Sequence, residues 1–158
     1  MFKFLKRAQE EKAAKAAKAA ERARPKCPRC HVPLNQHNIT TDVQSKTVEV
    51  DVCHPKGCGG VWLQEKDFKA DTKKSLLLDE ELLDLNLPHK LNVRYDTPAR
   101  CPDCKVVMKR VKWRDTDIVI DKCEQCNGRW FDGGEIHPIY EILLRDRHNL
   151  HRKPRQQP

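Results

Sequence analysis

The chain has 158 residues, of which 38% are hydrophobic and 34% are charged, with a formal net charge of +8 and a mean hydropathy of −0.81. A domain of this length with so few apolar residues cannot rely on one large hydrophobic core. Its eight cysteines, against only two methionines, point to metal sites or cross-links in place of the missing burial. No apolar run approaches the roughly 20 residues that a membrane-spanning helix requires, so we expect no membrane partner.

The first segment, residues 1–24, is rich in Ala, Lys, Glu and Arg and contains no Gly or Pro. Eight Lys and Arg against three Glu give it a net charge of +5, and its strong helix formers predict a basic helical arm. Two interpretations stay open for this arm: a solvated spacer and a contact for nucleic-acid phosphates. No apolar stretch of signal-peptide length follows the basic start, which predicts a cytoplasmic protein with reduced cysteines.

A repeat organises the chain after this arm. The sequence Cys-Pro-Arg-Cys at 27–30 recurs as Cys-Pro-Asp-Cys at 101–104, and each copy is followed by a β-rich stretch and a second Cys pair. Residues 58–63 (CGGVWL) also align with 126–131 (CNGRWF), so the repeat extends beyond the cysteines. We conclude that one unit is duplicated within the chain.

Each unit provides four cysteines with the spacing of a metal site. Two thiolates two residues apart form a tight turn, and two such turns facing each other across a hairpin make a tetrahedral site of four sulfurs. Residues 47–52 and 117–121 alternate apolar and polar side chains, which predicts strands that run into the second pair. Zinc is favoured, with rubredoxin-like iron and a disulfide as alternatives. The predicted ligands of two zinc ions per chain are Cys27, Cys30, Cys53 and Cys58 in the first site and Cys101, Cys104, Cys123 and Cys126 in the second.

The first unit departs from the second in its last turn. Four residues separate its last two cysteines where the second unit has two, so His54 is an alternative ligand. We favour Cys58, because the Gly-Gly-Val-Trp sequence at 59–62 puts it in register with Cys126.

Four thiolates leave no open coordination position on a zinc ion, so we expect structural sites and no enzyme activity. The sequence has no Ser-His-Asp arrangement, phosphate loop or dinucleotide motif. Trp62 and Trp130 lie at one fixed offset from a predicted ligand. Packing over the zinc knuckles is favoured for them, with base stacking as the alternative.

The most apolar segment between the units lies between Ser75 and Pro88. It places Leu78, Leu82 and Leu85 on one helical face, with Ser75 as the predicted cap and Pro88 as the stop. Packing of this helix against the ribbons is favoured, and partner binding or self-association through the remaining leucines is the alternative.

The last part of the chain carries a second predicted helix and a second basic segment. Asp132 and Glu135 have the spacing of a capping box ahead of a short helix over 138–144. Residues 145–158 have a net charge of +4 and end in a Pro- and Gln-rich sequence that predicts disorder.

Both units resemble the bacterial and phage zinc-finger family named after transcription factor IIB. Its pattern is Cys-Pro-x-Cys, a hairpin, and Cys-x-x-Cys-x-Gly-x-Trp-Leu-Asp-x-Gly-Glu-Leu. The second unit matches nearly throughout, whereas the first has Gln64 and Lys66 where the pattern has Asp and Gly. The resemblance implies zinc ribbons with four Cys ligands each, and the family name suggests transcription.

The expected fold is a small metal-stapled α+β protein with two tandem zinc ribbons, each a β-hairpin with zinc knuckles. We expect five segments: a basic helical arm (1–24), a first zinc ribbon (25–70), a leucine-rich helical linker (71–98), a second zinc ribbon with a C-terminal helix (99–147) and a basic disordered tail (148–158).

The expected function is that of a non-catalytic accessory factor. It would bind nucleic acid or a nucleic-acid machine such as RNA polymerase or the ribosome, with phosphate contacts at 1–24 and 145–158 and not on the ribbons. Two alternatives stay open: a protein-interaction adaptor that uses the ribbons and the leucine-rich linker, and an iron-binding redox protein.

Overall fold

The computed structural model describes residues 24–41, 46–53, 57–68, 76–77, 79–87 and 94–150. The predicted arm before residue 24, His54 and the chain beyond residue 150 lie outside the described residues. The elements are β1 (Asn35–Thr41), β2 (Lys46–Val52), β3 (Val61–Leu63), the 3-10 helix η1 (Glu65–Phe68), α3 (Glu80–Leu85), β4 (Lys109–Lys112), β5 (Val119–Lys122), β6 (Arg129–Phe131) and α4 (Ile136–Leu150). Across the part of the chain described, no helix is both long enough and apolar enough to cross a bilayer.

Both units contribute to one antiparallel sheet of six strands in the order β1-β2-β3-β6-β5-β4. The first unit supplies β1 to β3 and the second supplies β4 to β6, so the strand order is symmetric about the β3–β6 pair. At this junction Trp62 lies opposite Trp130. The predicted small α+β fold with two tandem ribbons is confirmed, and the structure adds that the ribbons are joined through their third strands.

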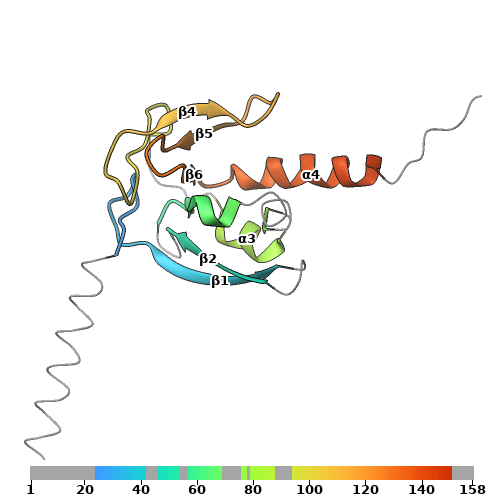
Figure 1. Ribbon diagram of the computed structural model, residues 1–158, viewed down its shortest axis with the longest axis horizontal. Coiled ribbons are helices and arrows are strands. Elements are labelled where there is room, and N and C mark those ends of the chain that lie inside the picture. Colours follow the sequence, from blue (N-terminus) through green and yellow to red (C-terminus); the bar gives the residue numbers. More distant parts are fainter. Residues whose placement is uncertain are drawn as a thin grey trace, which may run out of the picture.

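Successive side chains along each strand point to opposite sides, which gives the sheet two different faces. One face is aliphatic and packs against α3 and α4, which lie between the two hairpins (Figure 1). Its buried side chains include Ile39, Val50, Leu63, Ile120 and Phe131 from the strands and Ile136, Ile139 and Leu143 from α4. The other face carries Trp62 and Trp130, which cluster with the cysteines. Helices therefore cover one face, and the cysteine clusters and the indoles fill the other.

The linker forms a shorter helix than the sequence pattern predicted. Asp79 has an extended backbone, with φ −87° and ψ 125°, and its carboxylate accepts a hydrogen bond from the backbone N–H of Glu81 at 3.0 Å. This is the geometry of an N-cap, so one continuous helix from Ser75 is wrong: the aspartate ends the preceding turn and starts α3. Ser75 itself lies outside the described residues.

The leucines of this segment pack against the sheet, which is the interpretation that the sequence analysis favoured. Leu82 and Leu85 are buried as predicted, whereas Leu78 lies outside the described residues. Leu76 and Leu77 are buried as well, contrary to the helical-face argument, because they precede the break at Asp79 and belong to a different turn. Packing of the linker on the ribbons is therefore confirmed for four leucines.

Two predicted elements have shifted starts. β5 begins at Val119 instead of Asp117, because the turn before it extends to Ile118, whose N–H donates to the Thr116 hydroxyl. α4 begins at Ile136, two residues before the predicted start at Pro138. The strand predicted over 47–52 is confirmed by β2.

Candidate metal centres and the junction between the ribbons

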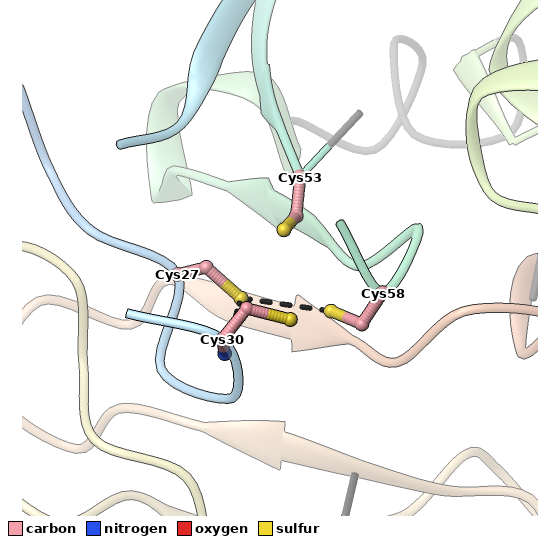
Figure 2. A group of neighbouring side chains, drawn as sticks. All are labelled: Cys27, Cys30, Cys53 and Cys58. Carbon is pink, nitrogen blue, oxygen red and sulfur yellow. Dashed lines mark hydrogen bonds between the residues drawn. The ribbon is translucent and has the colours of Figure 1, made fainter. Parts of the chain in front are cut away.

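The eight cysteines gather into two groups of four. Their sulfur atoms lie within 4.8 Å of one another in each group, and the groups have the predicted membership: Cys27, Cys30, Cys53 and Cys58, and Cys101, Cys104, Cys123 and Cys126. Figure 2 shows the first group, in which all four side chains point toward a common centre. No disulfide forms among these cysteines, so the disulfide alternative is wrong.

The distances within each group fit a tetrahedral zinc ion. A zinc–sulfur bond of about 2.3 Å places the sulfurs of a tetrahedral site about 3.8 Å apart. The Sγ atoms of Cys27 and Cys58 are 3.5 Å apart, and those of Cys101 and Cys126 are 3.7 Å apart. Backbone amides also point at the sulfurs: the N–H groups of Cys30 and Cys104 donate to the first sulfur of their own knuckle at 3.3 Å and 3.2 Å. The residues present therefore fit two zinc ions held by four cysteines each.

Crowding of the thiols makes a divalent cation favourable. Hydrogen bonds to Cys53 and Cys58, together with burial, raise the pKa of the Cys27 thiol, whereas the hydrogen bond from Cys27 lowers the pKa of Cys53. Four sulfurs this close therefore disfavour four negative charges unless a cation lies between them. A zinc ion supplies that cation and releases the thiol protons on binding.

A residue with a left-handed backbone follows each Cys pair in both units. The residue after the first Cys pair has a left-handed backbone in both units, at His31 (φ 61°) and Lys105 (φ 64°). The residue after the last ligand does too, at Gly59 (φ 72°) and Asn127 (φ 56°). The extra residues between Cys53 and Cys58 therefore leave the end of the first unit in register with the second.

The two tryptophans pack across the junction, each against a glycine of the other unit. A Cβ atom on Gly60 would lie 2.0 Å from the Trp130 ring, and one on Gly128 would lie 2.4 Å from the Trp62 ring. Both indoles are buried, so the predicted packing role is confirmed over base stacking. The sequence argument missed that each ring covers the other ribbon as well as its own knuckle.

A buried guanidinium from the first knuckle clamps the second unit. Arg29 donates to Asp132 through Nε at 2.8 Å and through Nη2 at 2.7 Å, and Nη2 also reaches Asp121 at 2.9 Å. Its Nη1 donates to the carbonyl of Thr97 at 2.7 Å, and the Tyr95 ring lies 5.9 Å from its Cζ. Since the Arg29 side chain is only 4% exposed, this is a buried ionic contact between the ribbons.

Charge and burial oppose each other around this clamp. Burial lowers the pKa of Arg29, but the hydrogen bond to Asp132 and the two carboxylate charges outweigh it and raise the pKa above its ordinary value. Burial raises the pKa of Asp121, and burial next to Asp132 raises that of Glu135 to about 8. Arg29 is the cation that compensates this cluster of acids.

The corresponding place in the first unit has no such clamp. Asp51 lies opposite Trp62 as Asp121 lies opposite Trp130, but the residue in the position of Arg29 is Asp103. One oxygen of Asp51 is buried without a hydrogen-bond partner in the described structure. Burial and the charge of Asp103 raise the pKa of Asp51 to about 6.

Two substitutions explain this orphaned oxygen. In the second unit the N–H of Ala99 donates to Asp121 at 3.3 Å. Pro25 occupies the equivalent position in the first unit and has no N–H to donate. Asp103 accepts the indole N–H of Trp62 at 3.1 Å in place of offering a cation to Asp51.

A single asparagine of the linker connects both ribbons to α4. The Asn86 amide nitrogen donates to the carbonyls of Gly59 at 2.8 Å and Asp132 at 3.1 Å. Its oxygen accepts from the N–H groups of Gly134 at 3.1 Å and Ile136 at 2.9 Å. The linker thereby satisfies the free amides at the start of α4.

The predicted capping box is only half formed. The Glu135 carboxylate accepts from the backbone N–H of Asp132 at 2.8 Å, as the spacing indicated. The Asp132 side chain is instead bound to Arg29 and to the indole N–H of Trp130, so Asn86 takes over its capping role. Pairwise spacing could not reveal Arg29 or Asn86, because their partners lie 92 to 103 and 27 to 50 residues away in the chain.

Two sites of four cysteines per chain, each carried on a β-hairpin with a third strand, define a protein of two zinc ribbons. A comparison with known families matches the transcription factor zinc-finger family, a TFIIB-type zinc ribbon, at residues 26–70 and 100–141. The matches cover more than half of the chain, and the chain belongs to this family. No curated protein and no solved structure matched it in the other two comparisons.

Proposed function

We propose that this protein is a non-catalytic accessory factor that binds nucleic acid or a nucleic-acid machine such as RNA polymerase or the ribosome. The observation that carries the proposal is the combination of two fully cysteine-ligated ribbons with strongly basic ends. The family description, transcription factor zinc-finger, points the same way. A cytoplasmic location fits eight unpaired thiols in metal-site arrangement.

A structural role for zinc supports the absence of catalysis in this proposal. Four thiolates saturate a tetrahedral zinc ion, so no position is left for a water molecule or a substrate oxygen. The strongly perturbed carboxyl groups among the described residues also have a structural explanation. Glu135 and Asp121 surround the buried Arg29, and Asp51 lies at the junction between the ribbons.

The basic ends supply the expected phosphate contacts. Residues 1–24 have a net charge of +5 and residues 145–158 a net charge of +4, whereas the chain between them is close to neutral. Binding through such segments releases counterions and therefore weakens steeply as salt increases.

The adaptor alternative loses support at the linker. Its contact was to include the surplus leucines of the linker, but Leu76 and Leu77 are buried against the sheet and Leu83 is partly buried there. Among the described leucines of this segment, Leu87 is the one that stays largely exposed, at 54%. One exposed leucine is a small surface for a protein partner.

A test of the proposal compares the full chain with a full-length variant in which the Lys and Arg of residues 1–24 are replaced by Gln. We expect the wild type to bind a labelled 20-nucleotide RNA or a 20-base-pair DNA duplex at about 150 mM salt, near physiological ionic strength. The variant should bind more weakly and with a smaller salt dependence. Absence of binding by the wild type to both probes would move the assignment to a protein partner, which a pull-down with and without nuclease would then identify.

A further inference from the structure

The backbone register places three cations in one row across the second ribbon. Lys109 lies opposite Lys122 in the β4–β5 pair, and Lys122 lies opposite Arg129 in the β5–β6 pair. Residues paired in this way project from the same face of a sheet. Because neighbouring strands are about 4.8 Å apart, the row extends over roughly 10 Å.

This row is unfavourable within the folded chain alone. Like charges directly opposite each other on adjacent strands destabilise a sheet. Lys122 and Arg129 are partly buried, and burial lowers the pKa of the Arg129 guanidinium. Glu65 acts on Arg129, and Glu124 lies 3.5 Å from Lys109, but the Lys109–Glu124 pair is solvent-exposed on both sides and contributes little.

Protection of a sheet edge explains only part of the row. Lysines on an edge strand prevent pairing with other chains, and β4 is an edge strand of this sheet. Lys122 and Arg129 belong to β5 and β6, which are interior strands with a neighbour on each side. Their charges therefore need another explanation.

The first ribbon shows what these positions look like without that charge. The equivalent residues are Asn35, Val52 and Val61, which are paired in the same register and carry no charge. Val52 and Val61 are fully buried, and the end of the linker lies beside them, where Asn86 binds the carbonyl of Gly59. The linker covers one ribbon, and the same place on the other ribbon keeps partly exposed cations.

We propose that Lys109, Lys122 and Arg129 bind the phosphate backbone of a nucleic-acid strand. At about 3.4 Å of helix axis per phosphate of one strand, three phosphates span about 7 Å, so a row of roughly 10 Å is long enough for each cation to reach a separate phosphate. The bound phosphates would offset the repulsion between the opposed cations. This inference rests on the proposed nucleic-acid function and adds a contact on the second ribbon to the basic ends, where the sequence analysis placed all phosphate contacts.

The test uses the full chain with zinc bound and removes two charges of the row. The variant Lys109→Gln/Lys122→Gln leaves the buried Arg29 clamp and Arg129 intact. The matched control, Lys26→Gln/Arg94→Gln, removes the same charge from two exposed residues outside the row. Affinity for the 20-nucleotide RNA and the DNA duplex is measured as a function of salt, and zinc content and melting temperature verify that both variants are folded.

For RNA, two lost contacts should lower the slope of log affinity against log salt by about 1.4, at about 0.7 per contact on single strands, and reduce affinity roughly tenfold at about 150 mM salt. The control should keep the wild-type slope. Equal losses in the row variant and the control, or no loss in the row variant, would overturn the inference and leave the proposed function standing. Failure of the wild type to bind either probe would overturn both.

Discussion

The two ribbons have the same strands and the same ligand spacing in outline, but they bury charge at their junction in different ways. On the second ribbon, Asp121 and Asp132 hold the guanidinium of Arg29. On the first, Asp51 faces Asp103, and one of its oxygens has no partner in the described structure. The difference follows from the residue at the third position of each Cys-Pro-x-Cys knuckle, together with Pro25 where the second unit has Ala99.

The comparison teaches what duplication within one chain permits. In a symmetric dimer of identical ribbons, every substitution at the junction would occur twice. In a tandem chain each position is single, so one half can specialise in holding the ribbons together while the other keeps a weaker contact. The linker adds to this asymmetry, because Asn86 contacts the end of β6 and the start of α4 as well as the first knuckle.

Removal of zinc should have the largest effect on the stability of the fold. Structural zinc contributes on the order of 10 kcal/mol or more to folding in small modules, so complete chelation should unfold both ribbons. The second site should lose its metal first, because Cys104 and Cys126 are both partly exposed, whereas only Cys30 is in the first site. Metal analysis should give two zinc ions per chain.

Cys126→Ser tests the same point at one site. Because the ribbons share a sheet, we expect it to destabilise the first ribbon as well as to unfold the second. One zinc ion in the wild type, stoichiometric iron, or native circular dichroism after complete metal removal would contradict this account.

Removal of the Arg29 clamp should have the next largest effect on stability. Arg29→Met leaves Asp121 and Asp132 buried without a cation, which typically costs about 3–5 kcal/mol. The matched control is Arg94→Met, where the partner Asp96 is exposed and loss of the pair should change stability little. Urea unfolding of the zinc-loaded proteins measures both, and similar losses in the two variants would show that the clamp is not a special contact.

Truncation of the tryptophans tests whether the junction is packed equally from both sides. Trp130→Ala should cost about 3–5 kcal/mol, because the indole is fully buried and bonded to Asp132. Trp62→Ala should cost less, because its indole N–H is bonded to the exposed Asp103. Unchanged stability of Trp130→Ala with a loss of nucleic-acid binding would instead assign this ring to base stacking.

Most of the metal chemistry could be predicted from the sequence because its signals are local. A Cys-Pro-x-Cys pair encodes its own turn, and the alternation that predicted β2 ends directly at a ligand. The leucine segment was predicted to pack on the ribbons from its apolar composition and its helical leucine spacing, and its buried leucines do so.

The junction could not be predicted, because its contacts are between residues far apart in the chain. Nothing in the pattern around Arg29 indicates that it is buried against Asp132, and β3 and β6 are too short, at three residues each, to give a periodic signal. The break at Asp79 was missed because a helical pattern with good leucine spacing concealed a capping residue. Alignment of the two copies does offer one clue: opposite charges at Arg29 and Asp103 mark a position where the copies differ in role.

The smallest change in stability is expected from a variant that rebuilds the missing clamp. Asp103→Arg/Gln64→Asp builds the mirror image of the Arg29 clamp: an arginine in the second ribbon's knuckle, equivalent to Arg29 in the first, and an aspartate two residues after Trp62, equivalent to Asp132 after Trp130. The new guanidinium should reach Asp51, and the new carboxylate should accept the Trp62 N–H that Asp103 now accepts. A hydrogen bond to a buried charged group typically contributes about 1.5–3 kcal/mol, and Pro25 still offers Asp51 no N–H, so we expect the free energy of unfolding in urea to rise by about 1 kcal/mol.

The control, Asp103→Arg alone, should gain less stability, because it leaves the Trp62 indole without an acceptor. A loss of stability in the double variant would mean that the two halves of the junction are not equivalent in backbone geometry, and that the asymmetry is fixed by the fold and not by these two positions.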